Sequence, residues 1–223
     1  MSFVRLAELA AASGGILFLM PFMLLAALTV SFERIWYLGR MLARSRRVTA
    51  RLAPLAILDR QILRAEIERL HGGPVARLLG VALEAAGDRT LLATRCEEAI
   101  MLEVPAIDRS LWVLDTIITL APLLGLLGTI VGMFNAFQVL GKPGSAPTEV
   151  TGGVAEALIA TAAGLLIAIV GIAFFNGLQT RVRLQVHELE TLKTMLLNRP
   201  VAEEDAEAAA DAPLIHLVGA AVE

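Results

Sequence analysis

Polar side chains interrupt two long apolar stretches of this 223-residue sequence, and three of them could take part in ion transfer. Thr129 lies near the middle of one stretch, and Thr161 lies in the other, five residues after Glu156. A threonine hydroxyl can donate and accept a hydrogen bond at once, so it can orient a water molecule or hold a carboxyl group. An acidic side chain in an apolar stretch tends to face a cavity or a partner. These three residues are therefore candidates for an ion path.

Each candidate also has a purely structural interpretation. A lone threonine hydroxyl in a helix often bonds to a backbone carbonyl one turn earlier. Glu156 stands near the end of its stretch, where it can lie just outside the apolar core of a membrane. Asp115, at the start of the other stretch, is expected at the level of lipid headgroups. The sequence leaves both interpretations open for the two threonines and for Glu156.

The two apolar stretches are long enough to cross a membrane. Residues 116–141 and 157–180 carry no charged side chain, and at about 1.5 Å per residue each helix exceeds the roughly 30 Å hydrocarbon core of a bilayer. A short link rich in Gly, Pro and Ser joins them, which predicts a transmembrane helical hairpin. The chain is 57% hydrophobic and has a mean hydropathy of +0.70, which excludes an ordinary soluble domain of this length.

A third apolar segment lies near the N-terminus. Residues 9–32 carry no charge, and we predict a membrane helix over residues 14–36. Pro21 lies within it and is tolerable where a neighbouring helix covers the freed carbonyl. Trp36 and Tyr37 follow at the depth where aromatic rings settle in a membrane. The alternative is a cleaved signal peptide, which requires positive charge before the apolar segment, whereas here the charge follows it.

The distribution of positive charge predicts the orientation of the helices. Between Glu33 and Arg51 there are six arginines and one acidic residue, and segments rich in Lys and Arg face the cytoplasm. Two more arginines follow the third helix, whereas the link between the second and third helices is nearly neutral. We therefore expect the N-terminus outside and the C-terminus in the cytoplasm.

The segments outside the membrane are predicted to be helical or disordered. In the polar insert, Gly72-Gly73-Pro74 and Gly87 are helix breakers. The three helices expected there cover 55–70, 75–86, and a stretch that begins near Thr90, kinks at Pro105 and runs into the membrane. After the third membrane helix, a packing stripe is expected at Leu184, Leu189, Leu192 and Leu196. Residues 202–211 are acidic and lack large apolar side chains, which predicts disorder.

These patterns together predict an all-α integral membrane protein with three transmembrane helices and long cytoplasmic helical extensions. Only the three apolar segments are long enough to span a bilayer. In chain order we expect a periplasmic N-terminus (1–13), transmembrane helix 1 (14–36), a cytoplasmic helical insert (37–110), transmembrane helix 2 (111–140), a periplasmic link (141–150), transmembrane helix 3 (151–178), a cytoplasmic helix (179–200) and a disordered acidic tail (201–223).

Composition excludes several functional classes. The net charge of −3 gives no basic field for nucleic acid, and the 5% aromatic content offers few platforms for base stacking. The single cysteine, Cys96, cannot form an intrachain disulfide, and the three histidines do not have metal-ligand spacing. The glycines of GLLGTIVG resemble those of a nucleotide loop, but no Lys-Ser/Thr follows. We expect no enzyme activity, no metal and no cofactor.

Small residues recur at spacings of three and four in the two central helices. Helices in lipid approach closely through small residues, because no hydrophobic force draws them together. Tight packing is therefore expected between these helices or with copies of them. The positions assigned to helix packing are Pro122, Gly125, Gly128, Gly132, Gly164 and Ala168.

Two motifs in these helices resemble one protein family. Residues 121–137 are APLLGLLGTIVGMFNAF, and residues 153–169 are GVAEALIATAAGLLIAI. Together with Glu33-Arg34 after the first apolar segment, they resemble the MotA/TolQ/ExbB proton-channel family. Three membrane helices fit its ExbB and TolQ branch, whereas the MotA branch has four.

The resemblance implies a function, partners and residue roles. It implies the channel-forming stator subunit of a motor in the bacterial inner membrane, driven by the proton-motive force and energising an envelope process such as outer-membrane import. It also implies a homopentameric ring around a single-span ExbD- or TolR-like partner whose aspartate carries the proton. A periplasm-spanning TonB- or TolA-like protein is a further expected partner, and lipid surrounds the ring. Thr129 and Thr161 match the family's channel threonines, and Glu156 matches its membrane glutamate.

One residue departs from the family pattern, and two other functions remain open. Asp115 stands where ExbB-like proteins often have a small apolar residue, which indicates either a different intracellular ion entrance or nothing. A self-sufficient ion transporter would need its own midplane ion site, for which only Glu156 is available. In a purely structural membrane scaffold, Thr129, Thr161 and Glu156 would be packing residues. The sequence does not decide between H⁺ and Na⁺.

Overall fold

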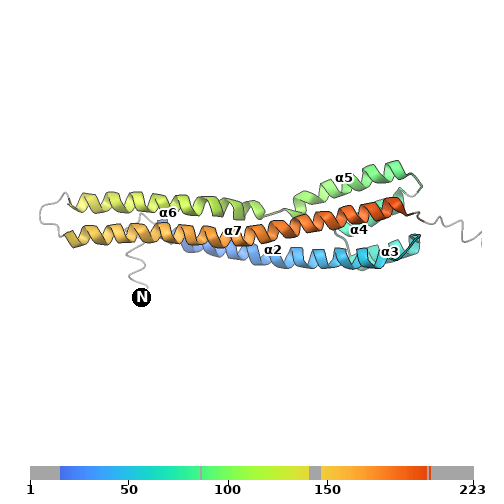
Figure 1. The fold of residues 1–223 in the computed structure, drawn as a ribbon, viewed down its shortest axis with the longest axis horizontal. Helices are drawn as coiled ribbons and strands as arrows, with labels where there is room; N and C mark the ends of the chain where they lie inside the picture. The colour runs from blue at the N-terminus through green and yellow to red at the C-terminus, as the bar shows by residue number, and fades with distance from the viewer. Residues whose placement is uncertain (1–15, 86, 141–146, 200, 202–223) are drawn as a thin grey trace, which may run out of the picture. The chain divides into compact units, whose positions relative to one another are not determined.

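The computed structural model describes residues 16–85, 87–140, 147–199 and 201. Apart from an isolated bridge between Leu58 and Val201, the regular secondary structure of these residues is helical, as the sequence predicts. Figure 1 shows the helices in chain order: α2 (Ile16–Leu52), α3 (Arg60–Leu70), α4 (Pro74–Glu84), α5 (Arg89–Ile107), α6 (Leu111–Leu140) and α7 (Pro147–Asn198).

Three helices are long and apolar enough to cross a membrane. The qualifying segments are Ile16–Leu52 in α2, Leu111–Gln138 in α6 and Thr151–Asn198 in α7, and an 18-residue stretch of each has a mean hydropathy of 2.0, 2.2 and 2.6, respectively. Their surfaces expose many large apolar side chains, such as Phe22 and Ile169. Apolar surface of this extent is unfavourable in water and compatible with lipid, so the prediction of three membrane-spanning helices is confirmed at this level.

The chain forms two compact units. Of the described residues, the first unit contains those within 16–40 and 108–183, and the second contains those within 41–107 and 184–201. The helices α2 and α7 therefore contribute residues to both units.

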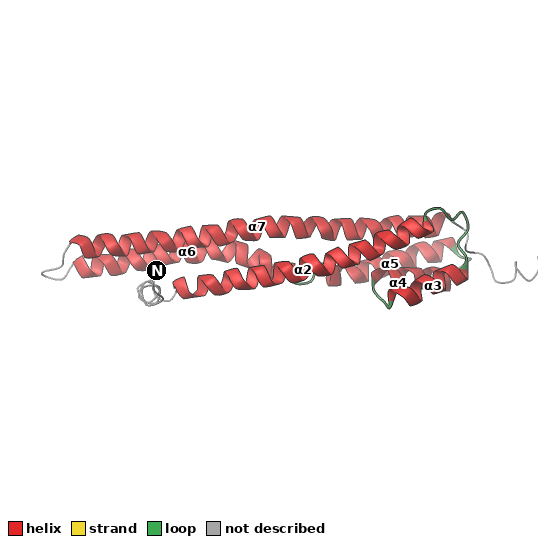
Figure 2. Ribbon diagram, turned by 90° about the horizontal axis from the view of Figure 1, so that it is seen from below, coloured by secondary structure: helices red, strands yellow, loops and turns green. Residues whose placement is uncertain are grey.

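In the first unit, α6 and α7 form an antiparallel hairpin, and α2 packs against it (Figure 2). The rings of Phe32 in α2 and Phe174 in α7 lie with their centroids 6.0 Å apart. About one turn further along α2 and two turns further along α7, Nη1 of Arg181 donates a hydrogen bond of 2.9 Å to the carbonyl oxygen of Ile35. These contacts fix the register of α2 against α7.

The helix before α6 does not run into the apolar segment, which corrects the prediction made from the sequence. The helix α5 contains Pro105 but ends at Ile107. Ser110 has a φ of 70°, a conformation that interrupts a helix, and α6 begins anew at Leu111. The chain therefore enters the apolar segment through a break and not through a continuous helix with a proline kink.

Local capping sets the bounds of the short helices in the second unit. The side chain of Asp59 accepts a hydrogen bond of 2.8 Å from the backbone N–H of Gln61, so α3 starts at residue 60 and not at the predicted residue 55. His71 ends α3 in the left-handed conformation. Gly73 has a φ of 99°, and Pro74 then occupies the first turn of α4, where its missing N–H costs no hydrogen bond.

The predicted leucine stripe of α7 is wrong at its first position. Leu184 is 37% exposed, whereas Gln185 is fully buried and donates a hydrogen bond of 2.7 Å from Nε2 to Oγ of Ser45. Residue 185, four before residue 189, is the one that shares its helix face. The buried leucines of the stripe are Leu189, Leu192 and Leu196.

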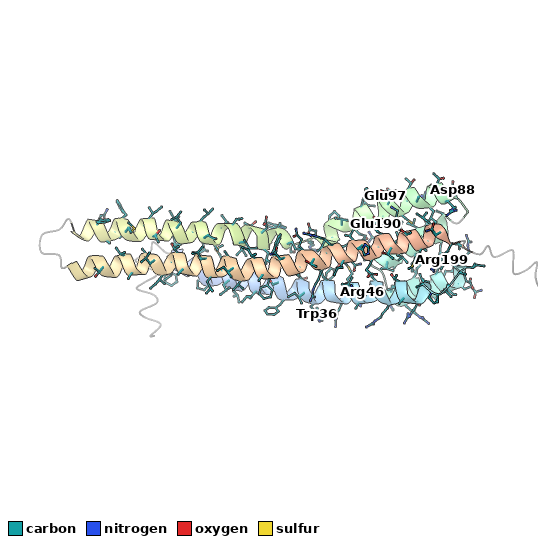
Figure 3. All side chains as sticks on the ribbon, viewed as in Figure 1. Trp36, Arg46, Asp88, Glu97, Glu190 and Arg199 are labelled. Carbon is teal, nitrogen blue, oxygen red and sulfur yellow. The ribbon has the colours of Figure 1, made fainter. Side chains whose placement is uncertain are left out.

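Ion pairs connect the helices of the second unit. The buried carboxylate of Glu66 in α3 lies 3.0 Å from Nη1 of Arg51 and 2.9 Å from Nη1 of Arg69. Lys193 of α7 lies 3.5 Å from a carboxylate oxygen of Glu97 and 3.5 Å from one of Glu190, both labelled in Figure 3. These pairs tie α2 to α3 and α5 to α7.

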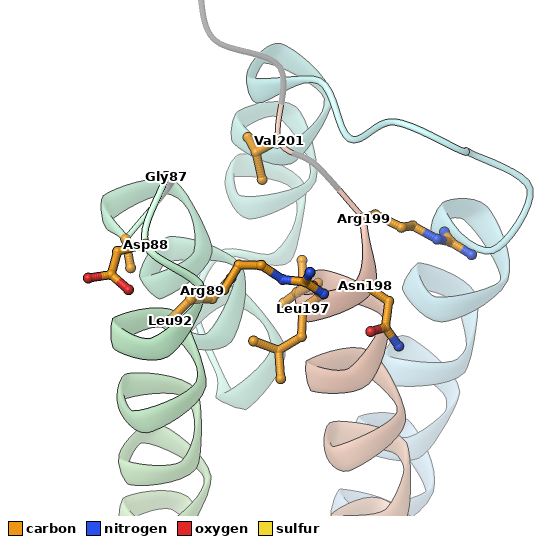
Figure 4. Close-up of a pocket in the computed structure, with 10 residues that line it drawn as sticks. Gly87, Asp88, Arg89, Leu92, Leu197, Asn198, Arg199 and Val201 are labelled. Atoms are coloured by element: carbon orange, nitrogen blue, oxygen red, sulfur yellow. The ribbon is translucent and has the colours of Figure 1, made fainter.

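At one end of the second unit, arginines satisfy carbonyl groups at helix ends. Arg199 donates to the carbonyl oxygens of Leu52 and Ala53 at 2.5 and 2.9 Å, so it adds a donor to carbonyl groups at the C-terminal end of α2. Arg89 donates to the carbonyl oxygen of Leu197 at 2.8 Å. Figure 4 shows Arg89 reaching towards Leu197 beside a cavity of about 270 Å³.

Several predicted segments lie outside the described residues. These are the N-terminus (1–13), the start of the first predicted membrane helix (14–15), link residues 141–146, Pro200 and the acidic tail from residue 202. The predicted link also included residues 147–150, which instead form the first turn of α7. Pro147 is compatible with that position because the first helical N–H has no partner within the helix.

Candidate ion path

The helices α6 and α7 approach so closely that glycines at their contact have no room for a side chain. A Cβ atom on Gly125 would lie 3.0 Å from the Cα of Thr161, and one on Gly132 would lie 2.9 Å from the Cβ of Ala157. A Cβ on Gly164 would overlap the carbonyl group of Ala121. Because the backbones are this close, a side chain of one helix can bond to the backbone of the other.

The remaining predicted packing residues lie in the same hairpin. A Cβ on Gly128 would lie 2.8 Å from the Cβ of Ala160, and Ala168 is buried. Pro122 is within α6, where it lacks the N–H that would normally bond to the carbonyl of residue 118. The glycines at residues 125, 128, 132 and 164 therefore lie where α6 and α7 of one chain come into contact.

Thr161 forms a hydrogen bond between the two helices. Its Oγ1 donates to the carbonyl oxygen of Gly125 at 2.9 Å. Because Gly125 has no side chain, the threonine can approach its backbone. The hydroxyl of Thr161 is therefore neither bonded within its own helix nor free; it connects α7 to α6.

Thr129 bonds within its own helix. Its Oγ1 donates to the carbonyl oxygen of Leu126 at 2.6 Å, which is the local geometry that threonine commonly adopts in helices. The side chain remains partly exposed. The oxygen of such a hydroxyl keeps its capacity to accept a hydrogen bond.

Thr129 lies on the flank of the hairpin that faces away from α2. Gly125 faces α7. Viewed along the axis of α6, Gly128 points about 60° to one side of Gly125, and Thr129 points about 40° to the other side. Gly128 is on the flank nearer α2, because a Cβ on it would lie 3.8 Å from Cγ2 of Ile16. The neighbouring position, Thr129, is therefore on the opposite flank.

Thr161 lies on the same flank as Thr129. Viewed along the axis of α7, Ala160 points about 40° to one side of Gly164, and Thr161 points about 60° to the other side. Ala160 contacts Gly128, on the flank nearer α2. The tertiary structure thus brings the two threonines to one side of the hairpin, although 32 positions separate them in the chain.

The two threonine oxygens can accept hydrogen bonds from a group outside the chain. Each threonine hydroxyl uses its hydrogen in a bond to a backbone carbonyl, so each oxygen presents acceptor sites. A water molecule or a protonated carboxyl group on this flank can donate to them. The same bonds also stabilise the helices, so the geometry supports a packing role as well.

The two acidic candidates are placed differently. Glu156 belongs to α7, but its side chain lies outside the described part of the structure. Asp115 is in the second turn of α6 and is exposed. Among the residues that the structure describes, no group of three His, Cys, Asp or Glu side chains could hold a metal ion.

Arg34 is a buried charged residue, which the sequence pattern did not indicate. Its side chain is 5% exposed, lies 3.4 Å from a carboxylate oxygen of Glu33 and donates from Nη2 to Oγ of Ser110 at 3.2 Å. Its guanidinium carbon lies 5.3 Å from the ring centroid of Tyr37. The six arginines that follow the first apolar segment look alike in the sequence, so burial of this one becomes visible only once α2 meets the break before α6.

Comparison with known proteins decides the family. The model of the MotA/TolQ/ExbB proton channel family matches residues 58–191, which is more than half of the chain. The chain belongs to this family. The match includes all of α6 and most of α7, and with them Thr129, Thr161 and Glu156.

Individual relatives are similar to this member of the MotA/TolQ/ExbB family over different lengths. The biopolymer transport protein ExbB-like 1 of Synechocystis is 33% identical over 184 residues, which cover 79% of this chain and 71% of that protein. ExbB of Aquifex aeolicus is 36% identical over 87 residues, covering 39% of this chain and 59% of that protein. TolQ of Haemophilus influenzae is 38% identical over 85 residues, covering 38% and 37%. These relatives support the ExbB/TolQ-like branch.

Proposed function

We propose that this chain is the channel-forming stator subunit of a motor that the proton-motive force drives in the bacterial inner membrane. The observation that carries the proposal is the position of Thr129 and Thr161 on one flank of a largely apolar membrane hairpin, in a chain of a proton-channel family. The output would be an envelope process such as outer-membrane import.

The proposed assembly is a homopentamer around a single-span ExbD- or TolR-like partner. The threonine flank of each hairpin would face the partner, because α2 covers the other flank. A TonB- or TolA-like protein that spans the periplasm is a further proposed partner. Exposed apolar side chains elsewhere on the three spans would contact lipid or neighbouring copies.

The proposed orientation places the N-terminus in the periplasm and the C-terminus in the cytoplasm. Its basis is the run of arginines that follows the apolar part of α2. Trp36 and Arg40 support the same boundary, since the guanidinium carbon of Arg40 lies 3.7 Å from the ring centroid of Trp36. An aromatic ring stacked against an arginine is typical of the lipid headgroup region, where the ring can contact the apolar membrane core and the guanidinium can contact charged headgroups.

The proposed chemistry is transfer of a proton along the threonine flank. A protonated carboxyl group of the partner would donate to the hydroxyl oxygen of Thr129 or Thr161, which holds the acid in its neutral form inside the apolar region. Release of the proton leaves a carboxylate, which is costly in lipid and favours movement of the partner. Glu156 is proposed as a further polar group of the path.

A structural scaffold is the second candidate, and the internal hydrogen bonds favour it. Both hydroxyls already donate to backbone carbonyls within one chain. In a scaffold, these bonds would be their whole role, and no proton would need to reach them. The two candidates differ in what happens when the hydroxyl oxygen is removed without a change of shape.

The deciding experiment compares Thr129→Val and Thr129→Ser in the full chain. Valine keeps the shape and removes the acceptor, whereas serine keeps the hydroxyl. The full chain is purified with the subunits that remain bound, its mass is measured by native mass spectrometry, and proton uptake is followed in liposomes with an entrapped pH dye. We expect valine to abolish proton uptake and serine to retain it, with an unchanged oligomer. Equal uptake by both variants would refute the role of the Thr129 hydroxyl in the path, and no uptake by the wild type would refute the channel role.

A further inference from the structure

Asp115 is the one charged residue of α6, and it has no ion-pair partner among the described residues. Its side chain is exposed. An acidic residue near a helix N-terminus is often explained by the helix dipole, but that effect is confined to the first turn. Asp115 is the fifth residue of α6, which begins at Leu111. Neither the helix dipole nor an ion pair among the described residues therefore accounts for Asp115.

Asp115 lies on the same face of α6 as Thr129. Asp115, Thr119, Pro122 and Thr129 are separated by four, three and seven residues, and these spacings keep side chains on one face of an α-helix. The α7 contact stripe of α6 contains Ala121, Gly125 and Gly132, which lie beside this face. Asp115 is thus on the flank that faces away from α2.

The groups on this flank are spaced along the helix axis. At about 1.5 Å per residue, Thr119 lies about 6 Å from Asp115, Gly125 about 15 Å and Thr129 about 21 Å. The bond from Thr161 to Gly125 places that hydroxyl at the 15 Å level. Between Thr119 and Gly125, Pro122 has no backbone N–H, so the carbonyl oxygen of residue 118 lacks its usual helical hydrogen bond. Oxygen atoms therefore recur from Asp115 to the middle of the apolar segment.

A polar residue of α7 lies at the level of Asp115 on the same flank. A Cβ on Gly171 would lie 2.8 Å from Cγ1 of Ile118, and this antiparallel register places Phe174 opposite Asp115. Asn176 is exposed and lies about 200° around the helix from Phe174. Because Phe174 contacts Phe32 of α2, Asn176 is on the side away from α2.

We propose that Asp115 is the group that passes the proton between the threonine flank and the cytoplasm. This proposal rests on the proposed function and adds the inner end of its path. The carboxylate binds a proton that arrives along the flank and releases the same proton to water at the cytoplasmic surface. No other bond forms or breaks. A fixed negative charge at this point also raises the local concentration of protons.

Glu33 provides a matched control for Asp115. It is an exposed acidic residue, with a side chain 57% exposed, and it follows Phe32, whose contact with Phe174 sets it at the level of Asp115. It belongs to α2 and is therefore not on the threonine flank. A general effect of negative charge at the membrane surface would appear in both residues, whereas a role in the path would appear only in Asp115.

The test measures proton uptake by the full chain, purified with the subunits that remain bound, in liposomes with an entrapped pH dye and a potassium diffusion potential. We expect Asp115→Asn to lower the initial rate about 100-fold, at the low end of the effects of a positioned proton-transfer group. Asp115→Glu keeps the carboxylate and should restore most of the rate, and Glu33→Gln should match the wild type. Native mass spectrometry should show the same oligomer for every variant.

The possible results separate this inference from the proposed function. Wild-type rates in Asp115→Asn would overturn the inference while the channel role stands. Equal losses in Asp115→Asn and Glu33→Gln would overturn it in favour of a surface-charge effect, and a changed oligomer in Asp115→Asn would overturn it in favour of a structural role. A wild-type protein that takes up no protons would refute both proposals.

Discussion

Thr161 and Gly125 form a hydrogen bond that joins two membrane-spanning helices, with Oγ1 of Thr161 2.9 Å from the carbonyl oxygen of Gly125. The glycine makes the bond possible, because a Cβ at residue 125 would lie 3.0 Å from the Cα of Thr161. Thr129, the other threonine of the flank, instead bonds to Leu126 in its own helix. The two residues should therefore differ in what they contribute to stability, even if they share a role in proton transfer.

Replacing each threonine by valine should separate these contributions. Thr161→Val removes a bond between helices and should destabilise the protein by about 0.6 kcal/mol, the average for such bonds in membrane proteins. Thr129→Val removes a local bond and should leave the stability within about 0.5 kcal/mol of the wild type. Thermal unfolding in a mild detergent measures both. Equal losses of stability would show that the bond to Gly125 has no special role.

Gly164→Ala should destabilise the α6–α7 hairpin. The added Cβ would overlap the carbonyl group of Ala121, and overpacking of this kind costs about 1–3 kcal/mol. Gly177→Ala is the matched control in the same helix, because a Cβ there has nothing within 4 Å, and it should be neutral or stabilising by up to about 1 kcal/mol. The measurement is the unfolding temperature of each variant. A stable Gly164→Ala protein would show that the two helices can move apart without loss.

Glu66→Gln should weaken the second unit more than Glu84→Gln does. The carboxylate of Glu66 is 6% exposed and pairs with Arg51 and Arg69. Both arginines are mostly exposed and can turn to water, so we expect a loss of about 1–2 kcal/mol and not the larger cost of a buried unpaired charge. Glu84 is 70% exposed and lies 3.5 Å from Arg95, so its change should stay within about 0.5 kcal/mol.

Limited proteolysis can compare Glu66→Gln with Glu84→Gln, because it detects local opening of α3. Faster cleavage within residues 60–70 is expected for Glu66→Gln alone. If Glu84→Gln opens this helix equally, the buried ion pairs do not account for its stability.

Cys96 should resist thiol reagents in the folded protein. Its side chain is fully buried, and burial raises the pKa of its thiol from 9.0 to about 11, against a smaller opposing effect of Lys193. Because the folded pKa lies above the unfolded one, this group's contribution to stability is complete below about pH 9 and is lost as the pH rises towards 11. Mass spectrometry after maleimide treatment at pH 8 should show labelling only in denaturant. Rapid labelling of the native protein would contradict the burial.

The proposed orientation can be tested with introduced cysteines, because native Cys96 should remain unlabelled. Ser45 is unsuitable as a cytoplasmic site, since it is 2% exposed and bonded to Gln185. Ala50 is exposed and is therefore a suitable cytoplasmic labelling site. A membrane-impermeant maleimide applied to intact cells should label Ser145→Cys and should label Ala50→Cys only after permeabilisation. The reverse pattern would overturn the orientation.

The sequence by itself determined the helical class, the three membrane segments and the family. Long uncharged stretches such as residues 116–141 leave few alternatives, because backbone groups in lipid must be satisfied within a helix. The motifs around Thr129 and Thr161 resemble those of one family, and the number of predicted membrane helices, three, indicated its ExbB/TolQ-like branch.

The sequence could not determine how the helices end or which polar residues are buried. The break at Ser110 and the capping of α3 by Asp59 depend on single backbone conformations, which periodicity does not encode. Burial of Gln185 in place of Leu184 depends on the register of α7 against α2, which Ser45 fixes through a hydrogen bond.

Only the tertiary structure placed Asp115, Thr129 and Thr161 on one flank. The spacing from Asp115 to Thr129 is visible in one helix, but the position of Thr161 depends on how closely α7 approaches Gly125. Which flank stays uncovered depends on where α2 packs, through contacts such as Phe32 with Phe174. Contacts between segments far apart in the chain leave no periodic signal in it, so the shared flank appears only when the three helices are packed together.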